Sequence, residues 1–415
     1  FEGQGDAERA LAAMKDASRY TRGHLSRDAV HALYGGAVTL SASRMDMARS
    51  CHFAYFMRYG LKARERTGAG FDAPQIGTFV HDVMEHTLRQ AKECGGLHTL
   101  SKDKLHALVR ASIEEYIDRV LPDLSEKSAR FRYLFNRLCA TVERIMDEVS
   151  EELQSSDFEP LAFELEFGAD GQLPAITIRE ENGTARVVGK VDRVDGWLHD
   201  GKLYLRVVDY KTGKKSFDLA ELRYGLGLQM LLYLFTLKEE GQMLFGGHEI
   251  VPAGVLYTPA REPMLRCARD TEPEKIEKAL KKELRRSGMV LEDPAVLQAM
   301  EHSAIESPCY LPIAVKRDGA VTGSLASAEQ LGKLSKYVDH ILHEITQEVF
   351  AGNIDADPYA RTPQQSACTY CEFASACHFE NGCGSDRMEY IKATKNDEFW
   401  QYIDEVNGEG AHENG

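Results

Sequence analysis

The chain has 415 residues, of which 43% are hydrophobic and 28% are charged, so it can bury a large core as a globular protein. Its net charge of −15 counts against a protein that simply coats nucleic acid, because such proteins are usually basic. No membrane-spanning run or signal peptide is visible, so we expect no membrane partner, and nine cysteines in a reducing compartment favour metal ligation over disulfides.

The first part of the chain contains one cysteine of interest. Residues 1–38 are expected to be a linker or the end of an upstream domain, with a short helix over 7–18. Because the chain begins with Phe1 rather than methionine, we expect further sequence upstream. Serines can cap the next helix, over 45–61, which carries Cys51. Taken alone, Cys51 is most simply a buried core thiol.

A second helix begins near Gly77 and carries His81 and Glu85, which lie one turn apart and share a face. A single histidine on a helix is more often structural than a metal ligand. Two long helical patterns follow, over 102–120 and 129–153, and their apolar spacing indicates core packing rather than a cofactor site.

Four consecutive strands are predicted next, over 158–167, 175–179, 185–195 and 203–210. Asp200-Gly201 is a tight-turn signal between the last two runs, so they should pair as a hairpin. Such a hairpin brings Asp192 or Asp195 beside Asp209 at the end of the fourth strand.

The end of the fourth strand combines acidic and basic chemistry. Asp209 and Lys211 share one face of the strand, and Tyr210 lies on the other. Asp-x-Lys alone is usually a solvated surface pair. Two carboxylates with a lysine, however, can hold a divalent metal and position its water for attack on a phosphodiester.

The rest of the chain is predicted as helices around one more strand. A helix over 217–237 places Gln229 and Tyr233 one turn apart, which by itself indicates ordinary packing. The remaining segments are an apolar strand, a charged helix with a solvated face, an amphipathic helix and an acidic, frayed C-terminal tail, over 253–257, 275–286, 331–350 and 384–415.

Three cysteines near the C-terminus have metal-ligand spacing. Cys368, Cys371 and Cys377 are separated by two and five residues, so one loop can wrap a single metal centre. A fourth thiolate can come from Cys383, which spacing favours and which would give a zinc knot, or from Cys51. The isolated cysteines are expected to be packing residues: Cys94, Cys139, Cys267 and Cys309.

Three motifs together resemble the RecB-like branch of the PD-(D/E)xK nucleases: Gly189-x-Val191-Asp192, Val208-Asp209-Tyr210-Lys211 and Gln229-x-x-x-Tyr233. The resemblance implies an α/β, restriction-endonuclease-like core, with a mixed central sheet flanked by helices. It places the nuclease domain at 39–383, with a helical insertion over about 88–155.

The same resemblance implies the roles of the site residues. Gly77-x-x-x-His81 is similar to the family's first motif, whose histidine reaches the active-site metal. Mg²⁺ (or Mn²⁺) would then be held by His81, Asp192, Asp209 and the carbonyl of Tyr210, with Asp195 the reserve for Asp192. Lys211 would position water, and Gln229 and Tyr233 would contact DNA near the cut. Glu85 is expected to be solvated or to lie behind the ligands.

The cysteines resemble the split iron–sulfur signature of AddB-type subunits of helicase–nucleases. In that signature one cysteine stands before the histidine motif, here in the setting Cys51-His52-Phe53-x-Tyr55-Phe56, and three follow the last strand. The resemblance therefore selects Cys51 over Cys383 and implies a [4Fe–4S] cluster on Cys51, Cys368, Cys371 and Cys377, in the loop 368–377.

This family relationship also implies a function and its rivals. We expect an exodeoxyribonuclease of the bacterial cytoplasm that acts on single-stranded DNA, on the 5′-terminated strand, during repair of double-strand breaks by recombination. An AddA-type subunit would be its heterodimer partner, and residues 1–38 would follow a helicase-like domain. The alternatives are a free-standing CRISPR-adaptation-type iron–sulfur nuclease and a non-catalytic iron–sulfur DNA-binding module.

Overall fold

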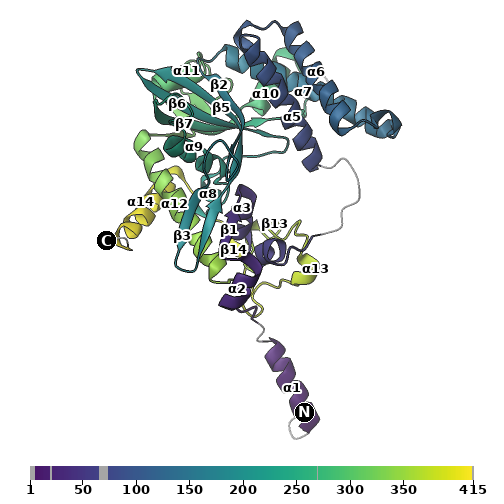
Figure 1. Ribbon diagram of the computed structural model, residues 1–415, viewed down its shortest axis with the longest axis vertical. Helices are drawn as coiled ribbons and strands as arrows, with labels where there is room; N and C mark the ends of the chain where they lie inside the picture. Colours follow the sequence, from purple (N-terminus) through teal and green to yellow (C-terminus); the bar gives the residue numbers. More distant parts are fainter. Residues whose placement is uncertain (1–4, 19–20, 65–72, 269, 414–415) are drawn as a thin grey trace.

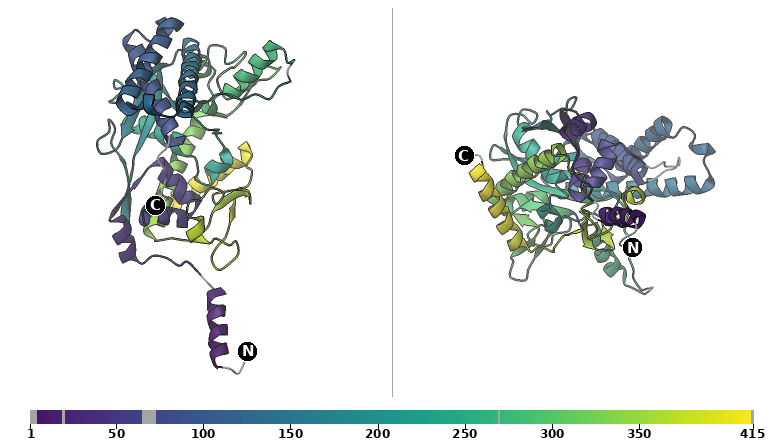
Figure 2. Two further views of the ribbon diagram at one scale, coloured as in Figure 1. Left: turned by 90° about the vertical axis from the view of Figure 1, so that its right-hand side faces the viewer. Right: turned by 90° about the horizontal axis from the view of Figure 1, so that it is seen from below.

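The computed structural model describes residues 5–18, 21–64, 73–268 and 270–413. Helix α1 (Gly5–Ser18) projects away from the body of the molecule, as Figure 1 and the left-hand view of Figure 2 show. Phe1, on which the expectation of upstream sequence depends, lies outside the described residues. None of the described helices combines the length and the apolar character that crossing a membrane requires.

A six-stranded mixed sheet forms the centre of the fold, in the order β11-β8-β7-β6-β5-β2. Its strands are β2 (Glu159–Phe167), β5 (Gly189–His199), β6 (Lys202–Lys211), β7 (Glu249–Pro259), β8 (Ser287–Leu291) and β11 (Leu325–Ala326). β6 and β7 run parallel, while β2, β5 and β6 form an antiparallel series. The predicted fold class, a mixed sheet flanked by helices, is confirmed.

The β5–β6 hairpin has the turn that the sequence predicts. Asp200 and Gly201 both have positive φ angles, 48° and 76°, as a tight two-residue hairpin turn requires. The register pairs Arg193 with Val208, so the next pair along the ladder sets Asp192 opposite Asp209. Alternation turns Asp195 toward the opposite face, and the hairpin therefore brings Asp192, not Asp195, beside Asp209.

A second, three-stranded sheet corrects one predicted strand. Its order is β1-β4-β3, from β1 (Ala37–Leu40), β4 (Gly183–Val187) and β3 (Ile176–Glu180). The continuous strand predicted over 185–195 is wrong, because β4 and β5 belong to different sheets. The chain changes sheet at Val188, whose N–H donates to the carbonyl of Leu40. Gly189 follows, where a Cβ would come within 2.5 Å of the rings of Phe167 and Tyr233.

Helices cover both faces of the central sheet (Figure 1). One group is α5 (Ala73–Glu93), α6 (Lys102–Val120) and α7 (Ala129–Gln154), and the other is α9 (Gln229–Glu240), α12 (Ala328–Phe350) and α14 (Asn396–Glu413). The single helix predicted over 217–237 is wrong, since α8 (Leu219–Arg223) ends before a loop and α9 begins at Gln229. Gly225 and Gly227 in that loop have φ angles of 73° and 68°, which no helix contains.

The C-terminal segment is not the frayed tail that its composition suggests. Residues 396–413 form α14, which packs against α12. Phe399 and Ile403 lie one turn apart and are fully buried, and Trp400 is 8% exposed. These apolar side chains give the acidic helix one buried face, which explains its order.

The remaining elements are short or peripheral. They are α2 (Arg27–Tyr34), α3 (Ala42–Ser50), α4 (His52–Tyr55), the π-helix η1 (Phe56–Gly60), α10 (Pro273–Leu284), α11 (Pro294–Met300), β9 (Ile313–Val315), β10 (Val321–Gly323), β12 (Tyr359–Thr362), β13 (Gln365–Ser366), α13 (Ala374–Cys377) and β14 (Glu389–Tyr390), with single 3₁₀ turns at Leu97–Thr99 and Leu124–Glu126.

Candidate active site

Acidic side chains and one histidine meet where α5 approaches β2, β5 and β6. The apolar face of α5 is fully buried at Phe79, Val80 and Val83, which fixes the helix and directs His81 toward the strands. His81, Glu164 and Asp192 each offer one ligand atom, and these atoms all lie within 4.8 Å of one another. Imidazole nitrogen and carboxylate oxygens in such a group are suitable ligands for a divalent metal.

The contacts of His81 define the shape of this group. Its Nδ1 is 3.4 Å from Asp192 Oδ1 and 3.9 Å from Glu164 Oε1. Its Nε2 is 2.9 Å from the carbonyl oxygen of Tyr210. The Tyr210 N–H in turn donates to Asp192 Oδ2 at 2.8 Å, which holds that carboxylate in place. The predicted ligands His81, Asp192 and the Tyr210 carbonyl are therefore neighbours.

Asp209 and Lys211 lie next to the group on the same face of β6. Lys211 Nζ is 2.7 Å from Asp209 Oδ2. That oxygen is buried and, apart from this ion pair, has no hydrogen-bond partner among the described residues. A carboxylate with unused acceptor capacity beside the His81 group fits a role in holding a cation.

Several carboxylates lie close together in the site, and their proximity and burial shift the pKa values of its titratable groups. Burial and the charge of Asp192 raise the pKa of Asp209 to about 6, although Lys211 opposes this shift. Burial would lower the pKa of His81, but Asp192, the Tyr210 carbonyl and Glu164 together raise it to about 9. Burial likewise raises the pKa of Glu164, against the effect of Lys190. A divalent cation would neutralise this concentration of negative charge.

Glu164 is the site residue that sequence reasoning missed. The register of β2 with β5 sets it opposite Asp192, and Lys190 Nζ lies 2.6 Å from its carboxylate. In sequence, Phe163 and Leu165 alternate with Glu164 and Glu166, a pattern typical of a solvated strand face. Only the pairing of β2 with the metal-site hairpin distinguishes Glu164, and the sequence does not show that pairing.

The predicted Gln229–Tyr233 pair is in contact. Gln229 Nε2 donates to the Tyr233 hydroxyl at 3.2 Å, one turn along α9. The Tyr233 ring packs edge-on against Phe167 at 5.3 Å, and burial raises its pKa. Glu85, in contrast, forms an ion pair with Arg89 at 2.8 Å.

Asp195, the alternative to Asp192 as a metal ligand, forms ion pairs away from the candidate metal site. It is fully buried on the other face of the sheet, where Arg193 and Arg206 donate to its Oδ2 at 2.9 and 2.8 Å. Arg193 also donates to the Tyr210 hydroxyl at 2.6 Å. The expectation that Asp195 could replace Asp192 at the metal is therefore wrong. Asp195 instead accepts from Arg193, which also donates to the Tyr210 hydroxyl.

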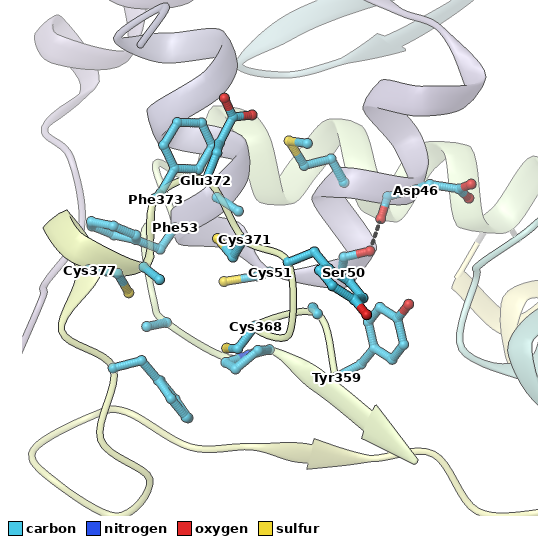
Figure 3. Close-up of a pocket in the computed structure, with 18 of the residues that line it drawn as sticks. Asp46, Ser50, Cys51, Phe53, Tyr359, Cys368, Cys371, Glu372, Phe373 and Cys377 are labelled. Atoms are coloured by element: carbon cyan, nitrogen blue, oxygen red, sulfur yellow. Dashed lines mark hydrogen bonds between the residues drawn. The ribbon is translucent and has the colours of Figure 1, made fainter. Parts of the chain in front are cut away.

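Four cysteines line one cavity of about 570 Å³: Cys51, Cys368, Cys371 and Cys377 (Figure 3). The helix predicted over 45–61 is interrupted here, because Cys51 has extended backbone angles (φ −175°, ψ 122°) between α3 and α4. Burial raises the pKa of Cys51 to about 12, so this thiol stays protonated unless a cation compensates its charge. Cys383 is exposed and does not line the cavity.

The spacing of the sulfur atoms bears on which group would fit. In the described part of the chain, no three cysteines bring their sulfurs within 4.8 Å of one another. A single zinc ion with Zn–S bonds of about 2.3 Å needs sulfurs about 3.8 Å apart. The described thiols therefore lack the close spacing that a single zinc site requires.

Comparisons with known proteins agree with this geometry. A sequence model of the PD-(D/E)XK nuclease superfamily matches residues 39–378. The B-subunit of the ATP-dependent helicase/deoxyribonuclease of Ruminiclostridium cellulolyticum is 30% identical over 412 residues, covering 98% of this chain and 36% of that protein. The proteins of the same name from Acetivibrio thermocellus and Caldanaerobacter subterraneus are 33% and 32% identical, covering 91% and 92% of this chain and 33% of each protein. The chain thus spans about a third of the length of the curated relatives it matches.

Proposed function

Because the chain belongs to the PD-(D/E)XK nuclease superfamily, we propose that it is the DNA-cleaving portion of an AddB-type helicase–nuclease subunit. The observation that carries this proposal is the meeting of His81, Glu164 and Asp192 within 4.8 Å, beside an Asp209–Lys211 pair. A group with this composition suits phosphodiester hydrolysis with a divalent cation.

Each side chain then has a defined task. His81, Glu164, Asp192 and Asp209 would hold Mg²⁺ (or Mn²⁺), which neutralises phosphate charge and lowers the pKa of a bound water. Lys211 is 2.7 Å from Asp209, and its ammonium would orient the attacking water and stabilise the charge that develops on the phosphate. Gln229 and Tyr233 form a polar pair at the start of α9 that suits contact with the DNA strand.

The four cysteines support a second cofactor proposal. Cys51, Cys368, Cys371 and Cys377 would hold a [4Fe–4S] cluster in the cavity of about 570 Å³. Cys51 comes before the metal-site histidine in sequence and the other three follow the last strand, so the cluster would join the two ends of the nuclease domain.

The partner is proposed from the relatives, whose name describes one subunit, designated B, of an ATP-dependent helicase/deoxyribonuclease. We therefore propose an AddA-type subunit as heterodimer partner. From the family resemblance we also propose cleavage of the 5′-terminated single strand, in the bacterial cytoplasm.

A cleavage assay tests the proposal. The chain should cut single-stranded DNA in Mg²⁺, and chelation of the metal should abolish cutting. Oligonucleotides labelled at the 5′ or the 3′ end report the polarity. Binding of DNA without any cutting, in Mg²⁺ or Mn²⁺, would instead support a non-catalytic iron–sulfur module.

A further inference from the structure

A basic hollow of about 310 Å³ lies directly beside Lys211. Five of its lining residues are basic and one, Glu283, is acidic; the basic residues are Lys211, Lys214, Lys215, Arg261 and Arg285. The lining therefore has a formal charge of +4, in a chain whose net charge is −15. Such a local reversal of charge attracts anions, although the chain as a whole is acidic.

Two of these cations have no carboxylate partner. Lys211, Lys215 and Arg261 form ion pairs with Asp209, Glu221 and Glu283 respectively. Lys214 and Arg285, in contrast, form no ion pair with any residue that the structure describes. Their charges are available to an outside anion.

Arg285 is held in place without being neutralised. Its Nη1 and Nη2 donate to the carbonyl oxygens of Ile313 and Pro308, at 3.2 and 2.6 Å. Its Nε is buried and has no hydrogen-bond partner among the described residues. A fixed guanidinium that no carboxylate neutralises adds a preorganised positive charge to the lining of the hollow.

The hollow continues the candidate active site on the far side of Lys211. Lys211 contacts Asp209 and also lines the hollow, and its ammonium lies 5.7 Å from the Tyr257 ring. Ser287, which lines the hollow, pairs with Tyr257 in the sheet. A DNA strand with its scissile phosphate at the acidic group would therefore bring a neighbouring phosphate over the hollow.

From this arrangement we infer that the hollow binds a backbone phosphate of the DNA strand next to the one being cut. The inference rests on the proposed nuclease function and adds the direction in which the strand leaves the metal site. The contact reads charge and not sequence, because the lining presents ammonium and guanidinium groups rather than an edge shaped for one base.

Binding of DNA at different salt concentrations tests the inference. The variant is Lys214→Gln/Lys215→Gln, and the matched control is Lys281→Gln/Lys282→Gln on α10. Each pair removes two exposed charges, one of them ion-paired, because Lys281 pairs with Glu277 as Lys215 does with Glu221. The control residues do not line the hollow. The probe is fluorescein-labelled oligothymidylate in NaCl without divalent cations, measured by anisotropy.

The slope of log affinity against log salt gives the number of phosphate contacts. It should become shallower by about 0.7 in the hollow variant, because the hollow contacts one phosphate and each phosphate contact to a single strand contributes about 0.7. The control variant should keep the wild-type slope. If the double variant does not fold, as judged by its melting curve, Lys214→Gln alone should make the slope shallower by up to about 0.7. Equal slopes in all folded variants would overturn the inference.

Cleavage in Mg²⁺ separates this inference from the proposed function. The hollow variant should have a raised KM and a kcat close to that of the wild type, because the lost contact is made equally in the ground and transition states. If the wild type cuts but the hollow variant has unchanged KM and salt slope, only the inference fails. If the wild type does not cut, the proposed function fails, and the salt slope still decides whether the hollow binds phosphate.

Discussion

Glu164 has the most strained backbone in the candidate metal site. Its φ angle is +48°, in the left-handed region that costs a residue other than glycine of the order of 1 kcal/mol. Its carboxylate is directed beside Asp192, where like charge and burial are both unfavourable. Such an arrangement is explained if a cation compensates both carboxylates, and Glu164 is therefore expected to bind the metal with His81 and Asp192.

Replacing Glu164 by Gln should weaken metal binding more than it weakens folding. The Mg²⁺ concentration for half-maximal cleavage should rise by about 10-fold or more, and excess Mg²⁺ should restore part of the rate. The matched control is Glu166→Gln, two residues along the same strand, whose exposed carboxylate is 3.6 Å from the same Lys190. Equal Mg²⁺ requirements in the two variants would show that Glu164 is not a ligand.

The sequence reveals one part of this site and conceals the other. Asp192, Asp209 and Lys211 are predictable because a short turn at Asp200-Gly201 fixes the register of adjacent strands. Glu164 is not, because its strand pairs with β5 across a long connection that includes a second sheet.

At the scale of elements, the break between α3 and α4 gives Cys51 its position. An uninterrupted helix would set the residue among its apolar neighbours, whereas the extended backbone at Cys51 places it in the cavity with Cys368, Cys371 and Cys377. A residue far away in the sequence stabilises the break in the helix, since His52 Nδ1 is 2.6 Å from Asp357 Oδ2. The sequence does not predict this break, because the segment has good helical spacing throughout.

Cys51→Ala and Cys383→Ala should therefore behave differently. The first should lose the iron–sulfur absorbance and lower the melting temperature, because a cluster that joins residues far apart in sequence limits the unfolded chain. The second should keep both iron content and melting temperature, since Cys383 lies outside the cavity. Metal analysis and melting curves of the two anaerobically purified variants make the comparison. Intact iron in Cys51→Ala, or its loss in Cys383→Ala, would contradict the cluster assignment.

A buried network of charges joins α7 to the central sheet. Glu152 of α7 meets Arg286 at 2.6 Å and Arg206 at 3.4 Å, and Arg193 and Arg206 share Asp195. Burial would raise the pKa of Glu152, but Arg286, Arg206 and Arg193 lower it to about 2. The charged helix predicted over 275–286 ends at Leu284, and Arg286 turns into this network instead of facing solvent.

Glu152→Gln should be strongly destabilising, because it leaves three buried guanidinium groups with a single carboxylate. We expect a loss of about 3–5 kcal/mol in the free energy of unfolding at neutral pH, measured with urea. The exposed neighbour Glu151→Gln is the control and should change it by less than about 0.5 kcal/mol.

The difference in the free energy of unfolding between the wild type and Glu152→Gln should depend on pH in a defined direction. Since folding lowers the pKa of Glu152 from 4.5 to about 2, its contribution is fully present above pH 4.5 and is lost as pH falls toward 2. The stability gap between wild type and Glu152→Gln should therefore narrow over that range. A gap that is small at neutral pH, or that widens in acid, would contradict this account of the network.

At the scale of the whole molecule, the fold class could be predicted because apolar runs of strand length alternate with helical patterns. The connections between the elements could not be predicted from the sequence. Gly225 and Gly227 divide one predicted helix, and α14 buries Phe399 and Ile403 while it packs against α12 and α8. Both outcomes depend on tertiary contacts that a local pattern does not contain.

The molecule has an acidic surface and a basic surface next to each other, and a nuclease needs both. Carboxylates gather at the His81 group, where a divalent cation would neutralise them, while the basic hollow begins immediately beyond Lys211. With net charge −15 over the whole chain, the protein should bind DNA weakly and locally by itself. Lys211 stands at the boundary of the two surfaces.

The central claim is therefore tested most directly by the rate at which Lys211→Ala cuts single-stranded DNA in saturating Mg²⁺. The rate should fall by about 10²-fold or more with an unchanged melting temperature, because the substitution removes a group that orients water but no core packing. Lys202→Ala is the matched control, since Lys202 stands at the other end of β6 and pairs with Glu249 at 3.0 Å, much as Lys211 pairs with Asp209. The control should cut like the wild type. A Lys211→Ala protein that also cuts at the wild-type rate would contradict the assignment of this site.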